Sequence, residues 1–191
     1  MYASMGRTLS HFESNSSQYL NKEFSSPRIT INADKEVTQK QNPQHLSAGA
    51  IYHTFKAMNE VIRPNADMQW QRFNSSAPIA WKTGTSFGHK DAWAIGVSPR
   101  YTIGIWVGNS DGEGKHNLVG VKKAAPLLFD VYNNLQSHKT FNVPYDDLHE
   151  RAACSQSGHL AGPHCEVVDT LYMPASKYHK LCPYHLSLIH I

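Results

Sequence analysis

The chain has 191 residues, 40% of them apolar, and a formal net charge of +3 from 18 basic and 15 acidic side chains. The basic residues are scattered, so the composition argues against a nucleic-acid partner, and no stretch approaches the roughly 20 apolar residues that cross a membrane. The start carries no signal-peptide hydrophobic segment, so we expect either a cytoplasmic protein or one whose targeting segment is missing from this sequence.

Two helices are predicted in the first third of the chain. The first opens the chain, because four apolar residues recur there at helical spacing. A short strand at residues 28–32 and an exposed turn or hairpin at 34–45 follow. Ser47 is suited to be the N-cap of the second helix, which Pro64 ends. The two apolar stripes are Tyr2, Met5, Leu9 and Phe12, and Ile51, Phe55, Met58 and Ile62.

Three antiparallel strands are predicted next, at residues 77–86, 91–97 and 101–108, and then a helix at 121–135. Small residues share one face of these strands and would let helices pack closely on the sheet. Together the elements predict an α+β fold, with an antiparallel sheet covered by helices. The small residues are Ala92, Ala94, Gly96 and Gly104.

The first of these strands contains the run Lys82-Thr83-Gly84-Thr85, whose groups suit acyl transfer on a peptide. An edge strand can pair with an extended peptide, and Gly84 leaves no side chain in the way. Lys82 supplies positive charge for a terminal carboxylate and for proton transfer, and both threonine hydroxyls can donate to that carboxylate. The N–H of Thr85 can form half of an oxyanion hole. A Lys-Thr-Gly triplet also arises by chance, so the triplet alone does not decide whether this strand belongs to an active site.

Three motifs lie in and after this strand: the run from Trp81 to Ser86, Lys-Asp-Ala-Trp at residues 90–93 and Trp-Val-Gly at 106–108. Together they resemble the end of the transpeptidase domain of class A penicillin-binding proteins. The last two motifs distinguish the chain from β-lactamases and from class B transpeptidases. The resemblance covers about residues 1–140, and residues 154–185 are similar to a tail that follows this domain in many such proteins. It implies substrate-binding and oxyanion roles for Lys82, Thr83, Gly84 and Thr85.

The two other active-site motifs of that family, Ser-x-x-Lys and Ser-x-Asn, occur nowhere in this sequence. In the family both lie upstream of the helix that resembles residues 2–12. We therefore expect a C-terminal fragment of the penicillin-binding, serine-transpeptidase-like fold. This fragment has no catalytic residue of its own and is inactive alone, because covalent catalysis requires the nucleophile.

The resemblance also implies a function for the parent protein, a peptidoglycan D,D-transpeptidase that acts on D-Ala-D-Ala stem peptides and is trapped by β-lactams. It implies no cofactor, a glycosyltransferase domain and membrane anchor upstream, and a place in the cell envelope, on the periplasmic face of the inner membrane. Two alternatives stay open. One is a D,D-carboxypeptidase or β-lactamase-like serine hydrolase, and the other is a non-catalytic module with the same fold.

All three cysteines lie in the last quarter of the chain, within a predicted linker and Cys/His-containing extension at residues 141–185. Such a cluster favours a disulfide or a metal site. Cys154, Cys165 and Cys182 with His185 form a ligand set that zinc accepts, although paired Cys-x2-Cys sequences are absent. The resemblance places this tail outside the cytoplasm, where disulfides persist, so we favour a Cys154–Cys165 disulfide over a metal.

The remaining features are interpreted as structural or foreign. Trp93 and Trp106 are expected in the core or packed on the sheet, and Asp146 and Asp147 as a solvated pair in the linker. Residues 186–191 match the translation of a transposase adapter used in sequencing libraries, so we interpret them as read-through and exclude them from the fold.

Overall fold

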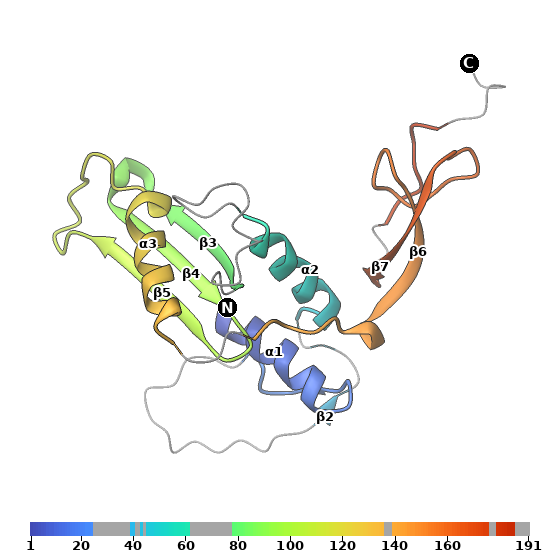
Figure 1. The fold of residues 1–191 in the computed structure, drawn as a ribbon, viewed down its shortest axis with the longest axis horizontal. Coiled ribbons are helices and arrows are strands. Elements are labelled where there is room, and N and C mark those ends of the chain that lie inside the picture. Colours follow the sequence, from blue (N-terminus) through green and yellow to red (C-terminus); the bar gives the residue numbers. More distant parts are fainter. Residues whose placement is uncertain are drawn as a thin grey trace.

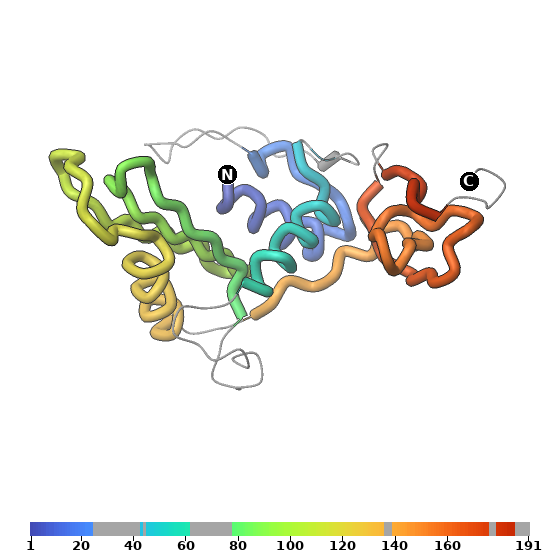
Figure 2. Tube along the Cα trace, turned by 90° about the horizontal axis from the view of Figure 1, so that it is seen from above, coloured from blue at the N-terminus to red at the C-terminus, as the bar shows by residue number. Residues whose placement is uncertain are grey.

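The computed structural model describes residues 1–24, 39, 40, 43, 45–61, 78–135, 139–175 and 179–185. It has a three-stranded sheet with helices on it and a smaller lobe toward the C-terminus (Figure 1). Seen from above, α3 (Gly120–Asn133) lies on one side of the sheet, and α1 (Tyr2–Ser14) and α2 (Ala48–Asn59) lie on the other (Figure 2). This confirms the predicted α+β architecture with an antiparallel sheet covered by helices.

The central sheet has the order β3 (Ala80–Thr85), β4 (Asp91–Val97) and β5 (Thr102–Gly108). Both pairings are antiparallel and in continuous register, so the three strands predicted in this stretch are confirmed. The first hairpin turns through η2 (Phe87–His89). Gly88 adopts φ 74° there, in the left-handed region that glycine enters without steric cost.

The face of the sheet under α3 is closed by an apolar cluster. The helix can come close because β4 presents small residues: a Cβ added at Gly96 would lie 2.6 Å from Cδ1 of Ile79 and 3.2 Å from Cδ1 of Leu128. The predicted small face is correct for β4, but Gly104 lies on the other face, paired with Ile95. The buried residues of the cluster are Ile79, Trp81, Ala92, Ala94, Leu118, Ala124, Ala125, Leu128, Phe129 and Tyr132.

The opposite face of the sheet is covered by α1 and α2. Met5, Leu9 and Phe12 of the first predicted stripe and Ile51, Phe55 and Met58 of the second are buried here, and Tyr2 is partly buried, which confirms the two helices. The last residue of the second stripe, Ile62, lies outside the described residues, as does the strand expected at 28–32. The buried residues are Met5, Leu9, Phe12, Tyr19, Ala48, Ile51, Phe55, Met58, Ala80 and Val97.

Three side chains satisfy the first N–H groups of α2. Ser47 is the N-cap that the sequence predicted, and its Oγ accepts an N–H of the first turn at 3.2 Å. The Oη of Tyr19, whose pKa is raised by burial, accepts the N–H of Ala48 at 2.8 Å. Oδ2 of Asp147 accepts the N–H of Gly49 at 2.7 Å. Asp147 is therefore not the solvated residue that was expected: its charge stabilises the positive end of α2.

Residues 148–185 form the terminal lobe, built on the antiparallel hairpin of β6 (Leu148–Cys154) and β7 (Val168–Pro174). β6 begins at Leu148, inside the stretch 141–185 that was expected to hold a linker and a Cys/His-containing extension. The strand was hidden in the sequence because residues 149–152 are all exposed and carry no alternating pattern. A short pairing joins β1 (Tyr19–Leu20) to β2 (Gln39–Lys40), and β2 lies within the stretch where an exposed turn or hairpin was expected.

The terminal lobe contacts α2. Nε2 of His53 lies 2.8 Å from the carbonyl oxygen of Tyr172 in β7, and the rings of Tyr145 and Tyr172 meet edge to face at 5.1 Å. Across the described ranges of the chain, no helix combines the length and the apolar character needed to cross a bilayer.

Candidate functional site

The run that the sequence singled out lies in the exposed half of β3, at one edge of the central sheet. Only β4 pairs with β3 among the described residues. Side chains alternate along a strand, so Lys82 and Gly84 lie on the face of α1 and α2, and Thr83 and Thr85 lie on the face of α3. The four residues therefore border the same open edge from both sides.

The backbone of this edge is available for pairing. The N–H of Ser86 donates to the carbonyl oxygen of Asp91 at 2.9 Å, which makes these two residues a hydrogen-bonded pair. Because such pairs alternate along an antiparallel ladder, the N–H and C=O groups of Thr83 and Thr85 point away from β4. Nζ of Lys82 donates to the carbonyl oxygen of Thr83 at 2.5 Å. An extended ligand can therefore add to the sheet at this edge.

Thr85 also joins β3 to the start of α3. Its Oγ1 accepts the N–H of Gly120 at 3.0 Å, so the hydroxyl still has its own proton to donate. Gly120 lies so close to the sheet that an added Cβ would be 2.5 Å from the carbonyl oxygen of Gly84 and 2.7 Å from that of Trp93. This contact could not be predicted from the sequence, because Gly120 ends a glycine-rich stretch that reads as a loop.

Replacing Gly120 with alanine is expected to destabilise the fold by about 1–3 kcal/mol. The new methyl group clashes with two backbone carbonyl oxygens of the sheet, and the clash is relieved only if α3 moves away from the sheet. Urea denaturation followed by far-ultraviolet circular dichroism measures the change. The matched control is Gly104→Ala, where no atom lies within 4 Å of the added Cβ. We expect that control to stay within about 0.5 kcal/mol of the wild type, and equal losses in both variants would contradict the close contact.

Two tryptophans form an aromatic surface beside this edge. Trp93 pairs with Gly84 on one side and with Trp106 on the other, and each tryptophan is 45% exposed. Nε1 of Trp106 donates to Oδ1 of Asp91 at 2.9 Å. Both were expected in the core or packed on the sheet. They are more exposed because α1 and α2 cover only the other end of this face, near Val97.

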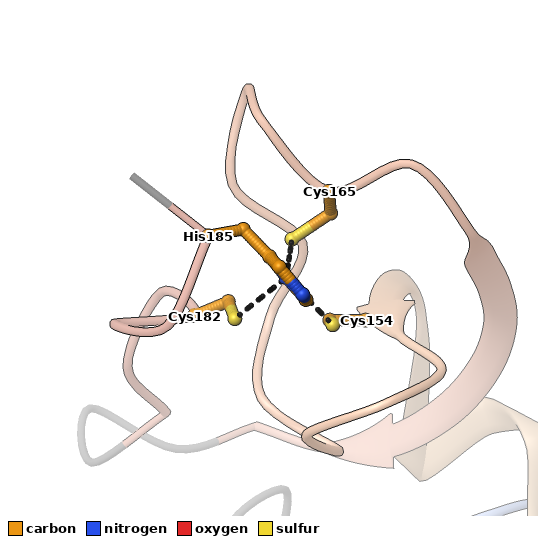
Figure 3. Close-up of side chains that lie close together, drawn as sticks. All are labelled: Cys154, Cys165, Cys182 and His185. Atoms are coloured by element: carbon orange, nitrogen blue, oxygen red, sulfur yellow. Dashed lines mark hydrogen bonds between the residues drawn. The ribbon is translucent and has the colours of Figure 1, made fainter. Parts of the chain in front are cut away.

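A second cluster lies in the terminal lobe, where four side chains converge (Figure 3). Cys154 ends β6, Cys165 lies in the loop before β7, and Cys182 and His185 follow in the last described segment. The ligand atoms of all four lie within 4.8 Å of one another. Nδ1 of His185 is 3.4 Å from Sγ of Cys154, 3.4 Å from Sγ of Cys165 and 3.3 Å from Sγ of Cys182.

Neighbouring polar groups orient this cluster. Oγ of Ser157 donates to Sγ of Cys182 at 3.2 Å, and the N–H of Gly162 donates to Sγ of Cys165 at 3.3 Å. Nε2 of His185 lies 2.9 Å from Oε1 of Gln156. The sequence interpretation missed Gln156, Ser157 and Gly162, because no spacing rule marks such outer residues.

The environment changes the acidity of the four groups unequally. The hydroxyl of Ser157, with backbone N–H groups, lowers the pKa of Cys182 to about 6 and also lowers the pKa of Cys154. Burial raises the pKa of Cys165. Burial disfavours the charged form of His185, but the contact with Cys182 and the charge of Cys154 outweigh it and raise the pKa. The site thus favours the thiolate at two of its sulfurs, which is the form that binds metals.

The three cysteines are free thiols in the structure. The Cys154–Cys165 disulfide that the sequence favoured stays a prediction. The chain returns to the same point with Cys182 and His185, so no two sulfurs are set apart as a pair. The ligand set that was the weaker alternative is the one that the fold brings together.

Comparisons with known proteins find similarity to penicillin-binding proteins. The chain is 44% identical over 101 residues to penicillin-binding protein 1C of Escherichia coli K12, which covers 53% of this chain and 13% of that protein. It is 31% identical over 108 residues to penicillin-binding protein 1B of Buchnera aphidicola, covering 48% of this chain and 15% of the relative. It is 27% identical over 154 residues to penicillin-binding protein 1A of Clostridium tetani, covering 75% of this chain and 19% of the relative. No family model matches the chain.

Among solved structures, penicillin-binding protein 1A of Haemophilus influenzae aligns with 71% of this chain and 22% of its own chain, at 20% identity and a TM-score of 0.48. The sequence matches confirm the resemblance to the penicillin-binding proteins that the motifs predicted, and the relative in Escherichia coli is of type 1C. The chain spans only 13–19% of the length of the three curated relatives.

Proposed function

We propose that this chain forms one wall of the acyl-transfer site of a peptidoglycan D,D-transpeptidase of type 1C. The observation that carries the proposal is the open edge of β3, where Lys82, Thr83, Gly84 and Thr85 surround unpaired strand backbone. The similarity to penicillin-binding proteins supports the same reaction class.

Each group on this edge has a role in the proposed reaction. The stem peptide pairs with β3, and Gly84 lets it approach the backbone. Lys82 and the hydroxyls of Thr83 and Thr85 hold the terminal carboxylate, and the N–H of Thr85 donates to the oxyanion. A serine elsewhere in the parent protein attacks the D-Ala-D-Ala carbonyl and releases the terminal D-Ala. An amine of a second strand then takes the acyl group from the serine.

The wider context of the parent protein is part of the same proposal. It acts in peptidoglycan synthesis in the cell envelope, on the periplasmic face of the inner membrane, and β-lactams acylate its serine. No cofactor takes part in this reaction. Its membrane anchor and a glycosyltransferase domain lie outside the 191 residues.

A second candidate function is a non-catalytic module with the same fold. The observation that favours it is the absence of Ser-x-x-Lys and Ser-x-Asn from the sequence. A D,D-carboxypeptidase or β-lactamase-like hydrolase is less favoured, because the motifs at residues 90–93 and 106–108 resemble those of transpeptidases.

Labelling with fluorescent penicillin separates these functions. The 191-residue chain is expected to show no label that survives denaturation, because it lacks the nucleophile. The product of the reading frame extended upstream into Ser-x-x-Lys is expected to be labelled. A stable label on the 191-residue chain would contradict the missing nucleophile. A frame that begins at Met1, with no Ser-x-x-Lys before it, would instead favour the non-catalytic module.

A further inference from the structure

We propose that Cys154, Cys165, Cys182 and His185 bind one Zn²⁺ ion that holds the terminal lobe in its fold. The distances support this directly. Tetrahedral zinc with Zn–S of about 2.3 Å and Zn–N of about 2.0–2.1 Å places the ligating nitrogen about 3.6 Å from each sulfur. Nδ1 of His185 lies 3.3–3.4 Å from the three sulfurs, and no two ligand atoms are more than 4.8 Å apart. A single ion fits the space that these four atoms surround.

The histidine is presented in the form that a metal requires. Nε2 of His185 donates to Oε1 of Gln156 at 2.9 Å, so the ring proton lies on Nε2 and the lone pair of Nδ1 faces the sulfurs. Such an outer hydrogen bond is a regular feature of zinc-bound histidines, and donors to the sulfurs stabilise thiolates. Ser157 and Gly162 provide these donors to Cys182 and Cys165.

The ligands come from segments that the backbone already holds in place. The N–H of Cys154 donates to the carbonyl oxygen of His159, and the N–H of Cys182 donates to that of Leu160, both at 2.8 Å. Four protein ligands leave no open position for a water or a substrate. The site is therefore structural rather than catalytic, and the ion joins the end of β6, the loop before β7 and the last segment.

The terminal lobe has little else to stabilise it. In the part of the chain that the structure describes, neither apolar cluster extends past Phe141. Units of roughly 40 residues or fewer usually need a metal, disulfides or a partner to fold. Among the described residues of the lobe, two of the four buried apolar ones are ligands themselves. The buried residues are Leu148, Ala153, Cys154 and Cys182, and the exposed ones include Val168, Leu171, Tyr172 and Leu181.

A zinc ion also accounts for all three cysteines, which a disulfide does not. Three cysteines within one chain leave one thiol unpaired after any disulfide forms, whereas one ion binds all three. Borderline-soft Zn²⁺ suits three thiolates and an imidazole, and Mg²⁺ and Ca²⁺ prefer oxygen ligands. The proposal depends on the lobe alone and does not rest on the reaction proposed for β3.

The metal content of the purified 191-residue chain tests the proposal. We expect one zinc per chain by inductively coupled plasma mass spectrometry. Exchange with Co²⁺ should give the visible bands of tetrahedral cobalt and a thiolate-to-cobalt charge-transfer band. Removing zinc with a chelator should make the amides of residues 148–185 exchange freely in hydrogen-exchange measurements, while those of residues 80–108 stay protected.

Variants give the controls. Cys182→Ser and His185→Ala should reduce zinc to trace levels, and Gln156→Ala should weaken binding about 10–100-fold because the histidine loses its orienting partner. His185→Cys should bind zinc again, with a stronger charge-transfer band in the cobalt form. His164→Ala is the matched control, an exposed histidine of the same lobe outside the ligand set, and should keep one zinc per chain.

Two results would overturn the proposal. One is zinc that stays at one per chain in both Cys182→Ser and His185→Ala, which would make it an adventitious ion. The other is a metal-free wild-type chain whose lobe is protected from exchange, with a Cys154–Cys165 disulfide found by peptide mapping. Because His185→Cys restores a complete ligand set, a failure of the other variants to fold would not hide either result.

Discussion

Replacing Trp81 with alanine is expected to lower the free energy of unfolding by about 3–5 kcal/mol. Trp81 is 1% exposed, packs edge to face on Phe129 at 5.1 Å, and its Nε1 donates to the carbonyl oxygen of Val61 at 3.3 Å. The smaller side chain leaves a cavity between β3 and α3 that a packed core cannot fill. The total free energy of unfolding of a domain of this size is only about 5–15 kcal/mol, so the substitution removes a large share of it. Urea denaturation followed by far-ultraviolet circular dichroism measures it.

The matched control is Trp93→Ala in the next strand. Trp93 has the same side chain but is 45% exposed, on the face of the sheet that the helices leave partly open. We expect a loss below about 1 kcal/mol, because little buried surface is removed. Comparable losses in the two variants would mean that Trp81 does not anchor the core.

Trp81 and Lys82 link stability to the proposed site. They are neighbours in β3, and their side chains point to opposite faces of the sheet. Burial of Trp81 between the sheet and α3 therefore fixes the register in which Lys82 and Gly84 face the other way. A slip of one residue would bury the lysine and expose the tryptophan, which the core strongly disfavours.

The sheet and its helices could be predicted because their signals are local. Alternating apolar residues at 91–97 and 101–108 mark the strands, and stripes at helical spacing mark α1 and α2. The run at β3 could be found for the same reason, since four consecutive residues carry it. Each of these features can be recognised from neighbouring residues in the sequence, without knowing which distant residues it contacts.

The features that the sequence did not predict depend on distant contacts. Asp147 caps α2 almost 100 positions away, and only the folded chain brings it to Gly49. Glycine is required at position 120 because carbonyl oxygens of β3 and β4 lie too close for a Cβ atom. The residues next to Gly120 in the sequence do not reveal this requirement. The sequence offers the three cysteines and His185 as a possible ligand set, but their spacing along the chain could not show that Cys182 and His185 return to Cys154.

In a protein that contains this segment together with its nucleophilic serine, Lys82→Ala is expected to slow acylation by penicillin about 10²–10³-fold, the loss typical of removing one group that stabilises developing charge. Lys82 is exposed at the open edge of β3, and its Nζ donates to the carbonyl oxygen of Thr83, which points away from β4. Without this charge, the carboxylate of the antibiotic loses its partner and the acyl carbon is held less well against the serine. The rate constant of labelling by fluorescent penicillin measures the effect.

Lys90→Ala is the control for this prediction. Lys90 is an exposed lysine of the hairpin that follows β3, outside the run that borders the edge. It carries the same charge, so general electrostatic attraction of the antibiotic would be lost equally in both variants. We expect Lys90→Ala to stay within about threefold of the wild type, because attraction between exposed charges is weak in salt solution. Equal slowing in both variants would assign the effect of Lys82 to net charge and contradict its proposed contact with the carboxylate.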